Sequence, residues 1–413
     1  MSSDSGSQGP TTDVEAYDLV VLGASFAGVE VLYQLWRRFD GKIKTAVVDR
    51  QRAHGYIPLV TERLCGGLEP GSSALQTSAY VESLPHTRFI EDEVTGFDPE
   101  TKQVTLASGR TLSGRMIVVA LGSVLRPPPT IGGHERMVVH KLQAEFEDAQ
   151  VRLLETLKGE GETPGIVVVG GGITGVELAG ELAHLAKKRP EGWRAPKVTL
   201  VTRGARLVEN LPASVARAVH KTLEGQGVDV RLNTGLNEVT DVSVLVEGSG
   251  GAPSEIPCAL AFWAGGVGPA PVLDALGLPQ TEAGWLSVGP SLQCFCTPEP
   301  THPEIFACGD AVRIQGGDGE WPTMQRAIEC LWQAKVVAKN LIRIVKQKPD
   351  DPDGPPPMLP HRLRASFPYG LSLGAKSLLV VGAARVHIPG VTAPFRRFLM
   401  RQYFDRYTPV ASS

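Results

Sequence analysis

The residues of this chain best suited to chemistry are three glycines near its middle. Gly170, Gly172 and Gly175 stand in GxGxxG spacing, after four hydrophobic residues at 166–169 and before apolar residues at helical spacing. The pattern predicts a strand, a tight turn and a helix. In such a unit the first glycine permits the turn, the second lets backbone approach a pyrophosphate, and the third lets helix and strand pack closely. Because a helix N-terminus favours phosphates, we expect a dinucleotide site here, with an ordinary turn as the alternative.

The same pattern occurs near the start of the chain with one substitution. Gly23, Ser25 and Gly28 follow an apolar run at 19–22. Serine at the middle position is small, and its hydroxyl can donate to a phosphate. The next predicted strand ends in Asp49, about 20 residues after Gly28, where a carboxylate binds a ribose diol. The sequence therefore predicts a second dinucleotide site, with a surface carboxylate as the alternative for Asp49.

The strand that follows the central turn, at 197–201, ends in Thr202 and Arg203 rather than in an acid. An acid at this place accepts from the ribose 2′-OH of NAD, whereas an arginine accommodates the 2′-phosphate of NADP. Arg206 follows three residues later. The sequence favours NADPH over NADH, and a solvated arginine is the alternative.

The length of the chain and the order of its motifs predict several domains. A chain of 413 residues is long for one core. An apolar strand ending in Gly309 and Asp310 follows the second turn, and a proline-rich spacer comes later. The prediction is an α/β fold with two Rossmann-like nucleotide-binding domains, the first split in sequence, plus a C-terminal segment. The expected parts are a disordered tail at 1–16, the first domain at 17–127 and 281–345, the second domain at 128–280, and a linker with a C-terminal segment at 346–413.

Shorter patterns predict further elements. Residues 87–112 are expected to form short antiparallel strands, and 116–120 a separate apolar strand. Helical spacing occurs at 212–224 and at 323–344.

Composition excludes some classes of function. The net charge is −3 and no long basic run occurs, so nucleic acid is not an expected partner. The polar N-terminal stretch shows no targeting signal, and no window is apolar enough to span a membrane, which predicts a cytoplasmic protein. Six cysteines include only one close pair, Cys294 and Cys296, so we expect neither a redox disulfide nor a metal site.

Taken together, these motifs resemble the two-dinucleotide flavoprotein superfamily of pyridine nucleotide oxidoreductases, and within it the type II NADH dehydrogenase and apoptosis-inducing-factor-like branch. The resemblance covers about 17–379. Its motifs are GASFAG, IPLVTERLCGG, VVALGS, VVVGGGITGVELAGEL, FWAGGVGPAPVLDALGL and IFACGDA.

The resemblance implies that the first unit binds FAD and the central unit binds NAD(P)H. Hydride would pass from NAD(P)H to FAD, and electrons then to a quinone or a similar small acceptor. Glu177 matches the glutamate that lies beside nicotinamide and flavin in this family, and a carboxylate that only complements the helix dipole is the alternative. The implied cofactor-binding residues are Gly23, Ser25, Phe26, Ala27, Gly28, Asp49, Arg50, Gly122, Gly309, Asp310, Ala311, Gln325, Gly170, Gly172, Ile173, Thr174, Gly175, Thr202, Arg203 and Gly265.

The chain departs from this branch at two places. Type II NADH dehydrogenases carry paired glutamines on the helix after Gly-Asp; here Gln325 is present, but Glu329 and Cys330 stand where the later glutamines are expected. This puts the respiratory quinone role in doubt. Cys65 has no partner at CxxxxC spacing, which disfavours the disulfide-reducing and sulfide-oxidising relatives.

The C-terminal stretch at 393–407 predicts a helix with Phe395, Phe398, Leu399 and Tyr403 toward one side. Three arginines, Arg396, Arg397 and Arg401, lie on or beside the other side. A basic aromatic helix suits peripheral contact with the inner face of a membrane. A helix docked on the flavin domain or on a dimer partner is the alternative.

Other functions stay open on sequence alone. The alternatives are a redox-sensing protein with slow turnover, a reductase of a protein electron carrier, and an oxidoreductase for one secondary metabolite.

Overall fold

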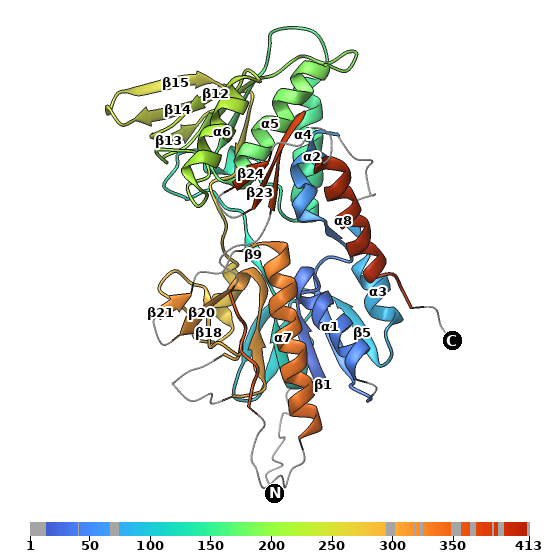
Figure 1. Ribbon diagram of the computed structural model, residues 1–413. Helices are drawn as coiled ribbons and strands as arrows, with labels where there is room; N and C mark the ends of the chain where they lie inside the picture. The colour runs from blue at the N-terminus through green and yellow to red at the C-terminus, as the bar shows by residue number, and fades with distance from the viewer. Residues whose placement is uncertain are drawn as a thin grey trace, which may run out of the picture.

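The computed structural model describes most of the chain. Two sheets, each with parallel central strands, carry the two glycine turns, and helix α8 runs beside both halves (Figure 1). The described residues are 14–39, 41–66, 74–294, 302–316, 319–321, 325–347, 357–363, 369–381, 384–386 and 392–410.

The first sheet has the strand order β5-β2-β1-β8-β7-β6, with β19 paired to β8. Helices α1 (Phe26–Arg38) and α7 (Ala327–Lys346) pack side by side against it (Figure 1). Its strands are β1 (Val14–Leu22), β2 (Thr45–Asp49), β5 (Thr87–Glu91), β6 (Val94–Asp98), β7 (Gln103–Leu106), β8 (Thr111–Val119) and β19 (Ile305–Ala307).

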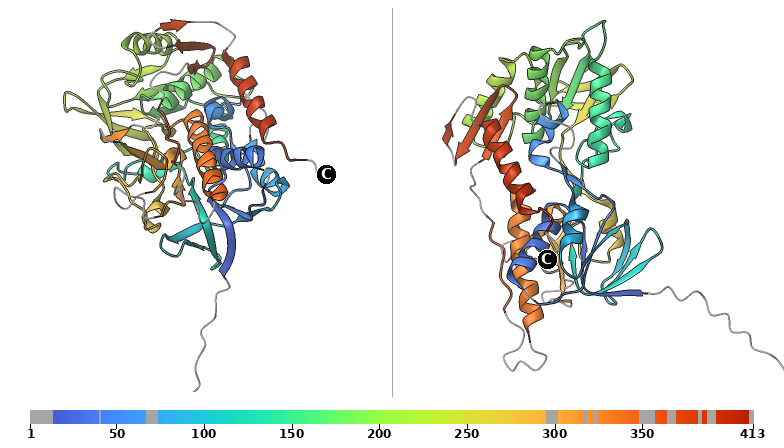
Figure 2. Two further views of the ribbon diagram at one scale, coloured as in Figure 1. Left: turned by 60° about the horizontal axis from the view of Figure 1, so that its bottom comes forward. Right: turned by 90° about the vertical axis from the view of Figure 1, so that its right-hand side faces the viewer.

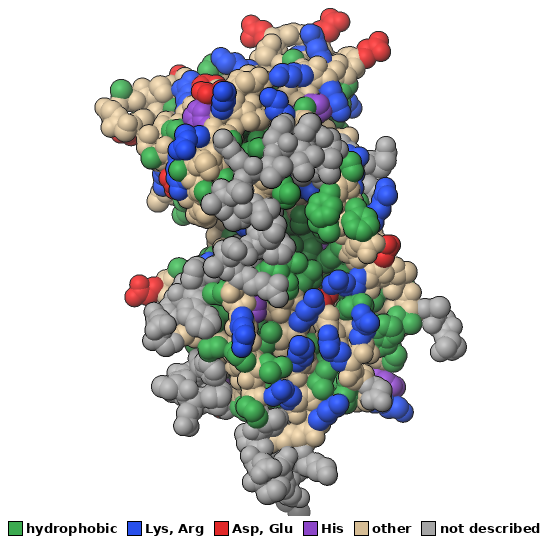
Figure 3. All heavy atoms as spheres, in the orientation of Figure 1, with side chains coloured by type: hydrophobic (Ala, Val, Ile, Leu, Met, Phe, Trp, Pro, Cys, Tyr) green, Lys and Arg blue, Asp and Glu red, His purple; other side chains and the backbone are tan. Residues whose placement is uncertain are grey.

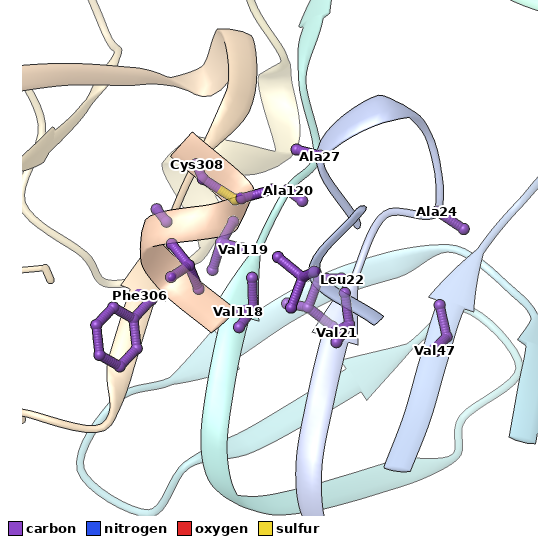
Figure 4. Packing of buried hydrophobic residues seen from close by; sticks show 14 of the residues in the cluster. Val21, Leu22, Ala24, Ala27, Val47, Val118, Val119, Ala120, Phe306 and Cys308 are labelled. Atoms are coloured by element: carbon purple, nitrogen blue, oxygen red, sulfur yellow. The ribbon is translucent and has the colours of Figure 1, made fainter. Parts of the chain in front are cut away.

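This sheet is assembled from two separated stretches of chain. β19 lies parallel to β8, with Ile305 opposite Ile117, although the whole second sheet intervenes in sequence. Figure 4 shows the apolar side chains that meet there, among them Val118, Val119 and Phe306. Both faces of these central strands are buried, which explains their unbroken hydrophobic runs. The prediction that the first domain is split in sequence is confirmed.

Three local predictions for this sheet were wrong. β1 begins at Val14, so the predicted tail at 1–16 overlaps a strand that pairs with β8, and 1–13 lie outside the described residues. β5 is parallel to β2, whereas only β6, β7 and β8 pair antiparallel. β8 also runs unbroken across the predicted gap before residue 116. Short alternating patterns do not reveal strand direction, because the pleat is the same in both.

The second sheet is four-stranded and parallel, in the order β12-β11-β10-β16. A smaller antiparallel sheet, β13-β14-β15, stands at its edge (Figure 1). The elements are α4 (Gln143–Leu157), β10 (Gly165–Val169), α5 (Ile173–Lys188), β11 (Lys197–Val201), α6 (Ala213–Glu224), β12 (Asp229–Arg231), β13 (Thr234–Val239), β14 (Ser243–Gly248), β15 (Pro253–Pro257) and β16 (Leu260–Trp263).

Short strands connect these halves. β9 (Ser123–Val124) and β17 (Gly268–Pro269) pair where the chain crosses between the two sheets. The remaining elements of the first half are β3 (His54–Gly55), α2 (Val60–Leu64), β4 (Ala74–Leu75), α3 (Thr77–Ser83), β18 (Leu286–Val288), β20 (Val312–Gly316) and β21 (Gly319–Trp321).

The C-terminal region forms a small sheet followed by α8 (Thr392–Arg406). The sheet comprises β22 (Tyr369–Leu373), β23 (Lys376–Val381) and β24 (Ala384–Val386), and β22 packs on α5. Figure 2 shows α8 running from this sheet down to α1. No helix within the described ranges is long and apolar enough to cross a membrane.

Candidate active site

The first glycine of each turn is required by its backbone. Gly23 has a φ of +99°, and a Cβ there would lie 2.4 Å from the carbonyl oxygen of Ala120. Gly170 has a φ of +127°, and its Cβ would lie 2.2 Å from the carbonyl oxygen of Ala264. Neither position admits a side chain, since both the φ and the contact exclude one. Each turn therefore passes directly against the end of a neighbouring strand.

The third glycines hold each helix on its turn. A Cβ on Gly28 or on Gly175 would lie 1.9 Å from the carbonyl oxygen of the first glycine in the same turn. A cavity of about 1800 Å³ lies between the two turns, and neither Gly28, Gly175 nor Ala311 lines it. These three predicted binding residues therefore lie behind the cavity wall, where the glycines have a packing role.

The middle positions face open space. A Cβ on Gly172 would meet nothing within 4 Å. Ser25 begins α1 without capping it through a side-chain hydrogen bond, so its hydroxyl is available to a ligand. Both residues line the cavity. The two turns thus present a hydroxyl in one case and bare backbone in the other to whatever binds.

One cavity of about 1800 Å³ connects the two turns. This exceeds the roughly 300–1,000 Å³ typical of one small-molecule site, so it has room for more than one ligand. Figure 3 shows the surface hollowed between the two halves, with hydrophobic side chains at the opening. The predicted residues that line it are Gly23, Ser25, Phe26, Ala27, Asp49, Arg50, Gly122, Gly309, Asp310, Gln325, Gly170, Gly172, Ile173, Thr174, Glu177, Thr202, Arg203 and Gly265.

Asp49 stands at the end of β2 beside the first turn. Its Oδ2 accepts from the Ala24 N–H at 2.7 Å, and its Oδ1 accepts from the Gln51 N–H at 2.9 Å. Burial raises the pKa of Asp49, and the two N–H groups partly offset the rise. Each carboxylate oxygen keeps a free lone pair, so the group can still accept from a hydroxyl.

Asp310 is held by a lysine that sequence reasoning did not single out. Its Oδ2 accepts from Lys141 Nζ at 2.9 Å and from Ser123 Oγ at 2.9 Å. Burial alone would raise the pKa of Asp310, but the Lys141 ammonium and the Ser123 hydroxyl lower it below its usual value. The lysine precedes α4 and carries no motif, so only the three-dimensional structure could find it. A fixed ionised carboxylate thus faces the cavity.

The two arginines after β11 differ in what they do. Arg206 donates to the carbonyl oxygens of Leu211 at 2.8 Å and Glu209 at 2.5 Å, so it fixes its own loop. Arg203 is exposed and lines the cavity. Of the two, Arg203 is therefore the one placed to meet a ligand.

Glu177 forms a buried ion pair that the sequence pattern does not show. Its Oε1 accepts from Arg396 Nη1 at 2.9 Å and from the Ser372 N–H at 2.9 Å, and its Oε2 lies 3.3 Å from Arg396 Nη2. Arg396 also donates to the carbonyl oxygen of Pro58. Arg396 therefore lies inside the cavity wall rather than on a solvated helix face.

Helix α8 has two different surfaces. Met400 and Tyr403, with Tyr407 just after the helix, are buried against the core of the first sheet, whereas Phe395 and Phe398 are 52% and 54% exposed. The predicted apolar side is therefore divided: Tyr403 docks the helix and the aromatic side chains near its start face outward. Arg397 pairs with Glu62, and Arg401 is exposed.

Tyr403 joins α8 to a buried histidine. His54 Nε2 lies 2.9 Å from the Tyr403 hydroxyl, and His54 Nδ1 lies 3.0 Å from Thr77 Oγ1. Burial lowers the pKa of His54 to about 4. The imidazole is therefore neutral, and it fixes the C-terminal helix to the first domain.

Glu329 and Cys330, which stand where the relatives' paired glutamines are expected, have side chains that point in different directions. Glu329 is turned away from the cavity, and its Oε1 lies 2.5 Å from His361 Nε2. Cys330 lines the cavity with its Sγ 3.5 Å from Asp310 Oδ1, and burial raises the pKa of its thiol well above the usual value. Gln325 lies beside them at the cavity wall, and Met324 lies outside the described residues.

Two polar side chains at the cavity wall have atoms without a hydrogen-bond partner among the described residues. His140 is 1% exposed and neither ring nitrogen has a hydrogen bond; Thr61 Oγ1 is likewise buried and unpaired. Burial lowers the pKa of His140 to about 4, so its imidazole is neutral. The two glycine turns, together with the carboxylates of Asp49 and Asp310 in the wall of the same cavity, fit dinucleotide cofactors.

Metal and disulfide chemistry find no support in the described ranges. No group of three or more His, Cys, Asp or Glu side chains there could hold a metal ion. Cys65, Cys258, Cys294, Cys308 and Cys330 are free thiols, and Cys296 lies outside those ranges.

Comparison with known proteins identifies the family. Residues 17–334 match the model of the pyridine nucleotide-disulphide oxidoreductase family, so the chain belongs to that family. The expected resemblance and the α/β fold with a Rossmann-like core are confirmed, and FAD and a pyridine nucleotide are the cofactors characteristic of such proteins.

The chain is also similar to two proteins named as type II NADH:quinone oxidoreductases. The chain is 28% identical over 375 residues to the type II NADH:quinone oxidoreductase of Haemophilus influenzae, covering 80% of this chain and 81% of the relative. It is 24% identical over 352 residues to the type II NADH:quinone oxidoreductase NdhA of Mycobacterium tuberculosis, covering 79% and 72%.

Among solved structures, NDH2 from Plasmodium falciparum in complex with NADH superimposes with a TM-score of 0.80 at 14% identity, covering 96% of this chain and 97% of that one. At this identity the likeness shows the fold alone.

Proposed function

We propose that this protein is an FAD-dependent NAD(P)H dehydrogenase that passes hydride from NAD(P)H to FAD and then electrons to a quinone or a similar small acceptor. The observation that carries the proposal is the single cavity into which both glycine turns open. Relatives named for NADH:quinone oxidoreduction support these substrate classes. Bound flavin would supply the two-electron chemistry, and the protein supplies position and electrostatics.

The first turn has the groups needed to hold FAD. The N–H groups at the start of α1 and the Ser25 hydroxyl suit a pyrophosphate. Asp49 suits a ribose diol, and Asp310, kept ionised by Lys141, suits the hydroxyls of the ribityl chain. These assignments use acceptors and donors that line the cavity.

The second turn and Glu177 would position the nicotinamide. The start of α5 suits the second pyrophosphate, and Arg203 suits a 2′-phosphate. Glu177 is held by Arg396 and Ser372, and its Oε2 retains a lone pair that can accept from the carboxamide N–H. Because a small displacement of a reacting group is costly, this rigid support matters for hydride transfer.

The opening of the cavity suits an apolar acceptor. Phe395 and Leu399 of α8 line the cavity and are exposed. Exposed apolar side chains beside a cavity favour a hydrophobic acceptor and peripheral contact of this edge with the inner face of a membrane. The carboxylate and thiol at Glu329 and Cys330 argue that the acceptor is not bound through paired amides.

The decisive experiment is anaerobic stopped-flow mixing of the yellow protein with NADH or NADPH, followed by a short-chain quinone. Fast bleaching of the flavin and fast reoxidation by quinone are expected. Fast bleaching with sluggish reoxidation would instead indicate another acceptor or a sensing protein. A purified protein without flavin would overturn the proposal.

Glu177→Ala tests the positioning role. Bleaching by NADH should slow about 100-fold, the order expected when a reacting group is displaced by about 1 Å, while FAD is retained. Glu181→Ala is the matched control, because Glu181 lies one turn later and bonds the same Ser372. Equal loss of FAD and of bleaching in the Glu177 variant would reject the assigned role.

A further inference from the structure

Three helices of the flavin half present an unusually basic outer face. Figure 3 shows Lys and Arg side chains gathered over α7 and α1. On α1, α7 and α8 the described acids are Glu30 and Glu329, which are buried, and Asp405. The cations that are exposed or half-exposed on these helices are Arg37, Arg38, Lys335, Lys339, Arg343, Lys346, Arg397, Arg401 and Arg406. Since the whole chain carries a net charge of −3, positive charge is concentrated on this face.

A small pocket of about 350 Å³ lies where the three helices meet. Among the described residues, no carboxylate lines it. Its walls are Tyr33, Gln34, Arg37 and Arg38 of α1, Lys335 of α7 and Arg406 of α8.

Of the four cations in the pocket wall, only Arg406 has an acidic partner among the described residues. Arg406 Nη1 donates to Glu30 Oε2 at 3.2 Å beneath the pocket. Arg37 bonds the Tyr33 hydroxyl at 2.9 Å and Arg38 bonds Gln34 Oε1 at 2.7 Å, and both of these partners are neutral.

Lys335 has neither an ion pair nor a hydrogen bond within the part of the chain that the structure describes. Three like charges converging without acids repel one another, and a bound anion relieves that repulsion.

The donors fit phosphate. Guanidinium groups match two phosphate oxygens at once, and an ammonium adds a point charge. A phosphate group could come from a dissolved compound or from a lipid headgroup.

Exposed apolar side chains on the same helices favour the lipid. Trp36 is 43% exposed and directly precedes Arg37, while Phe398 and Leu399 of α8 are 54% and 43% exposed. A bilayer offers a layer of phosphates above a layer of acyl chains, whereas a dissolved phosphate offers nothing to aromatic side chains.

We propose that this pocket binds the phosphate of an anionic phospholipid headgroup, so that the face formed by α1, α7 and α8 docks on a negatively charged bilayer. The proposal rests on the proposed function in one respect, because docking on this face would bring the cavity opening to lipid-dissolved acceptors.

Flotation of the holoprotein with vesicles tests the pocket. Vesicles of phosphatidylcholine alone are compared with vesicles that also contain phosphatidylglycerol. The pocket variant combines Arg37→Gln, Arg38→Gln and Lys335→Gln. The control combines Lys197→Gln, Arg217→Gln and Lys221→Gln, which removes the same charge from exposed positions of the nucleotide half.

Wild type should bind only the vesicles that contain phosphatidylglycerol. The pocket variant should bind them about 100-fold more weakly, since each membrane-facing cation contributes roughly fivefold, and the control should resemble wild type. Equal losses in both variants, or equal binding to both vesicle types, would overturn the proposal. Calorimetric binding of inorganic phosphate without vesicle binding would overturn the lipid assignment as well.

The dehydrogenase reaction is tested separately in the same samples. Flavin bleaching by NADH and reoxidation by a water-soluble quinone should be unchanged in the pocket variant, which lies outside the cavity. A wild type that floats but does not bleach would refute the proposed function and leave the lipid site standing, and active protein that never floats would do the opposite.

Discussion

The two glycine turns have nearly the same backbone and present different chemistry. In both, the first glycine passes against a strand-end carbonyl and the third against the first, with Cβ distances that no side chain could meet. They differ at the middle position, Ser25 against Gly172, and at the end of the next strand. There the flavin-side turn has buried Asp49, and the nucleotide-side turn has exposed Arg203.

This comparison distinguishes residues that fix the path of the backbone from residues that contact the ligand. Positions without room for a Cβ fix the path of the chain, whatever the ligand. Positions that face open space or carry a polar group decide which ribose or phosphate is bound. Substitutions at the first kind of position should therefore lower the stability of the fold, whereas substitutions at the second kind should weaken binding of a cofactor.

The largest effects should come from the third glycines. Gly28→Ala forces a Cβ to within 1.9 Å of a carbonyl oxygen. Such overpacking should cost roughly 3 kcal/mol of unfolding free energy, so the variant should lose FAD and unfold at lower temperature. Gly175→Ala should keep FAD and lose NAD(P)H binding.

Gly172→Ala is the control, because its Cβ would meet open space. Its melting temperature should match wild type while its affinity for NAD(P)H falls. A Gly28→Ala protein that keeps FAD and has an unchanged melting temperature would show that this position admits a side chain, contrary to the comparison.

His140 belongs to neither turn and adds a dependence on pH. Its pKa is about 4 in the folded protein, against an ordinary value of 6.5, because burial disfavours the imidazolium. The unfolded chain therefore binds the proton first, and stability is lost as pH falls from 6.5 toward 4, by up to roughly 3 kcal/mol.

Urea unfolding across this pH range measures the loss. His140→Phe should flatten the slope, and His54, with the same direction of shift, should account for much of what remains. If His140→Phe leaves the dependence of unfolding free energy on pH unchanged, the pKa of His140 is the same in the folded and unfolded chain.

Asp49→Ala should weaken FAD binding by roughly 2 kcal/mol, or about 30-fold, the usual cost of losing a hydrogen bond to a charged group. Fluorescence of released FAD on dilution measures it. Because we propose that the pyridine nucleotide binds at the other turn, the dissociation constant for NAD⁺ should stay the same. A parallel loss of both affinities would mean that Asp49 acts on the fold.

The smallest effect concerns nucleotide choice. Arg203→Ala should raise the KM for NADPH about 10-fold, the order expected for one exposed charged hydrogen bond to phosphate, with NADH nearly unchanged. Arg206→Ala should affect both nucleotides alike, since Arg206 supports its loop. An unchanged KM for NADPH would remove the 2′-phosphate role from Arg203.

The sequence could predict the features that depend on local spacing. Both turns, the strand that ends in Asp49 and the C-terminal helix follow from short-range patterns of glycines and apolar residues. The pairing of Glu177 with Arg396 could not be predicted, because these residues are far apart in sequence and carry no shared pattern. Nor could His140, a single histidine after two valines, be distinguished from an ordinary core residue.

The pairing of β19 with β8 has a consequence for biosynthesis. The flavin-side sheet cannot close until Ile305 has left the ribosome, although Ile117 emerges much earlier. At about 5–20 residues per second, the first strands wait on the order of 10–40 s with an open edge. The strands of the second sheet are made within that interval, but β22, which packs on α5, follows only after β19. Completion of both halves is therefore a late event in the life of the nascent chain, because β19 and β22 both lie in its last third.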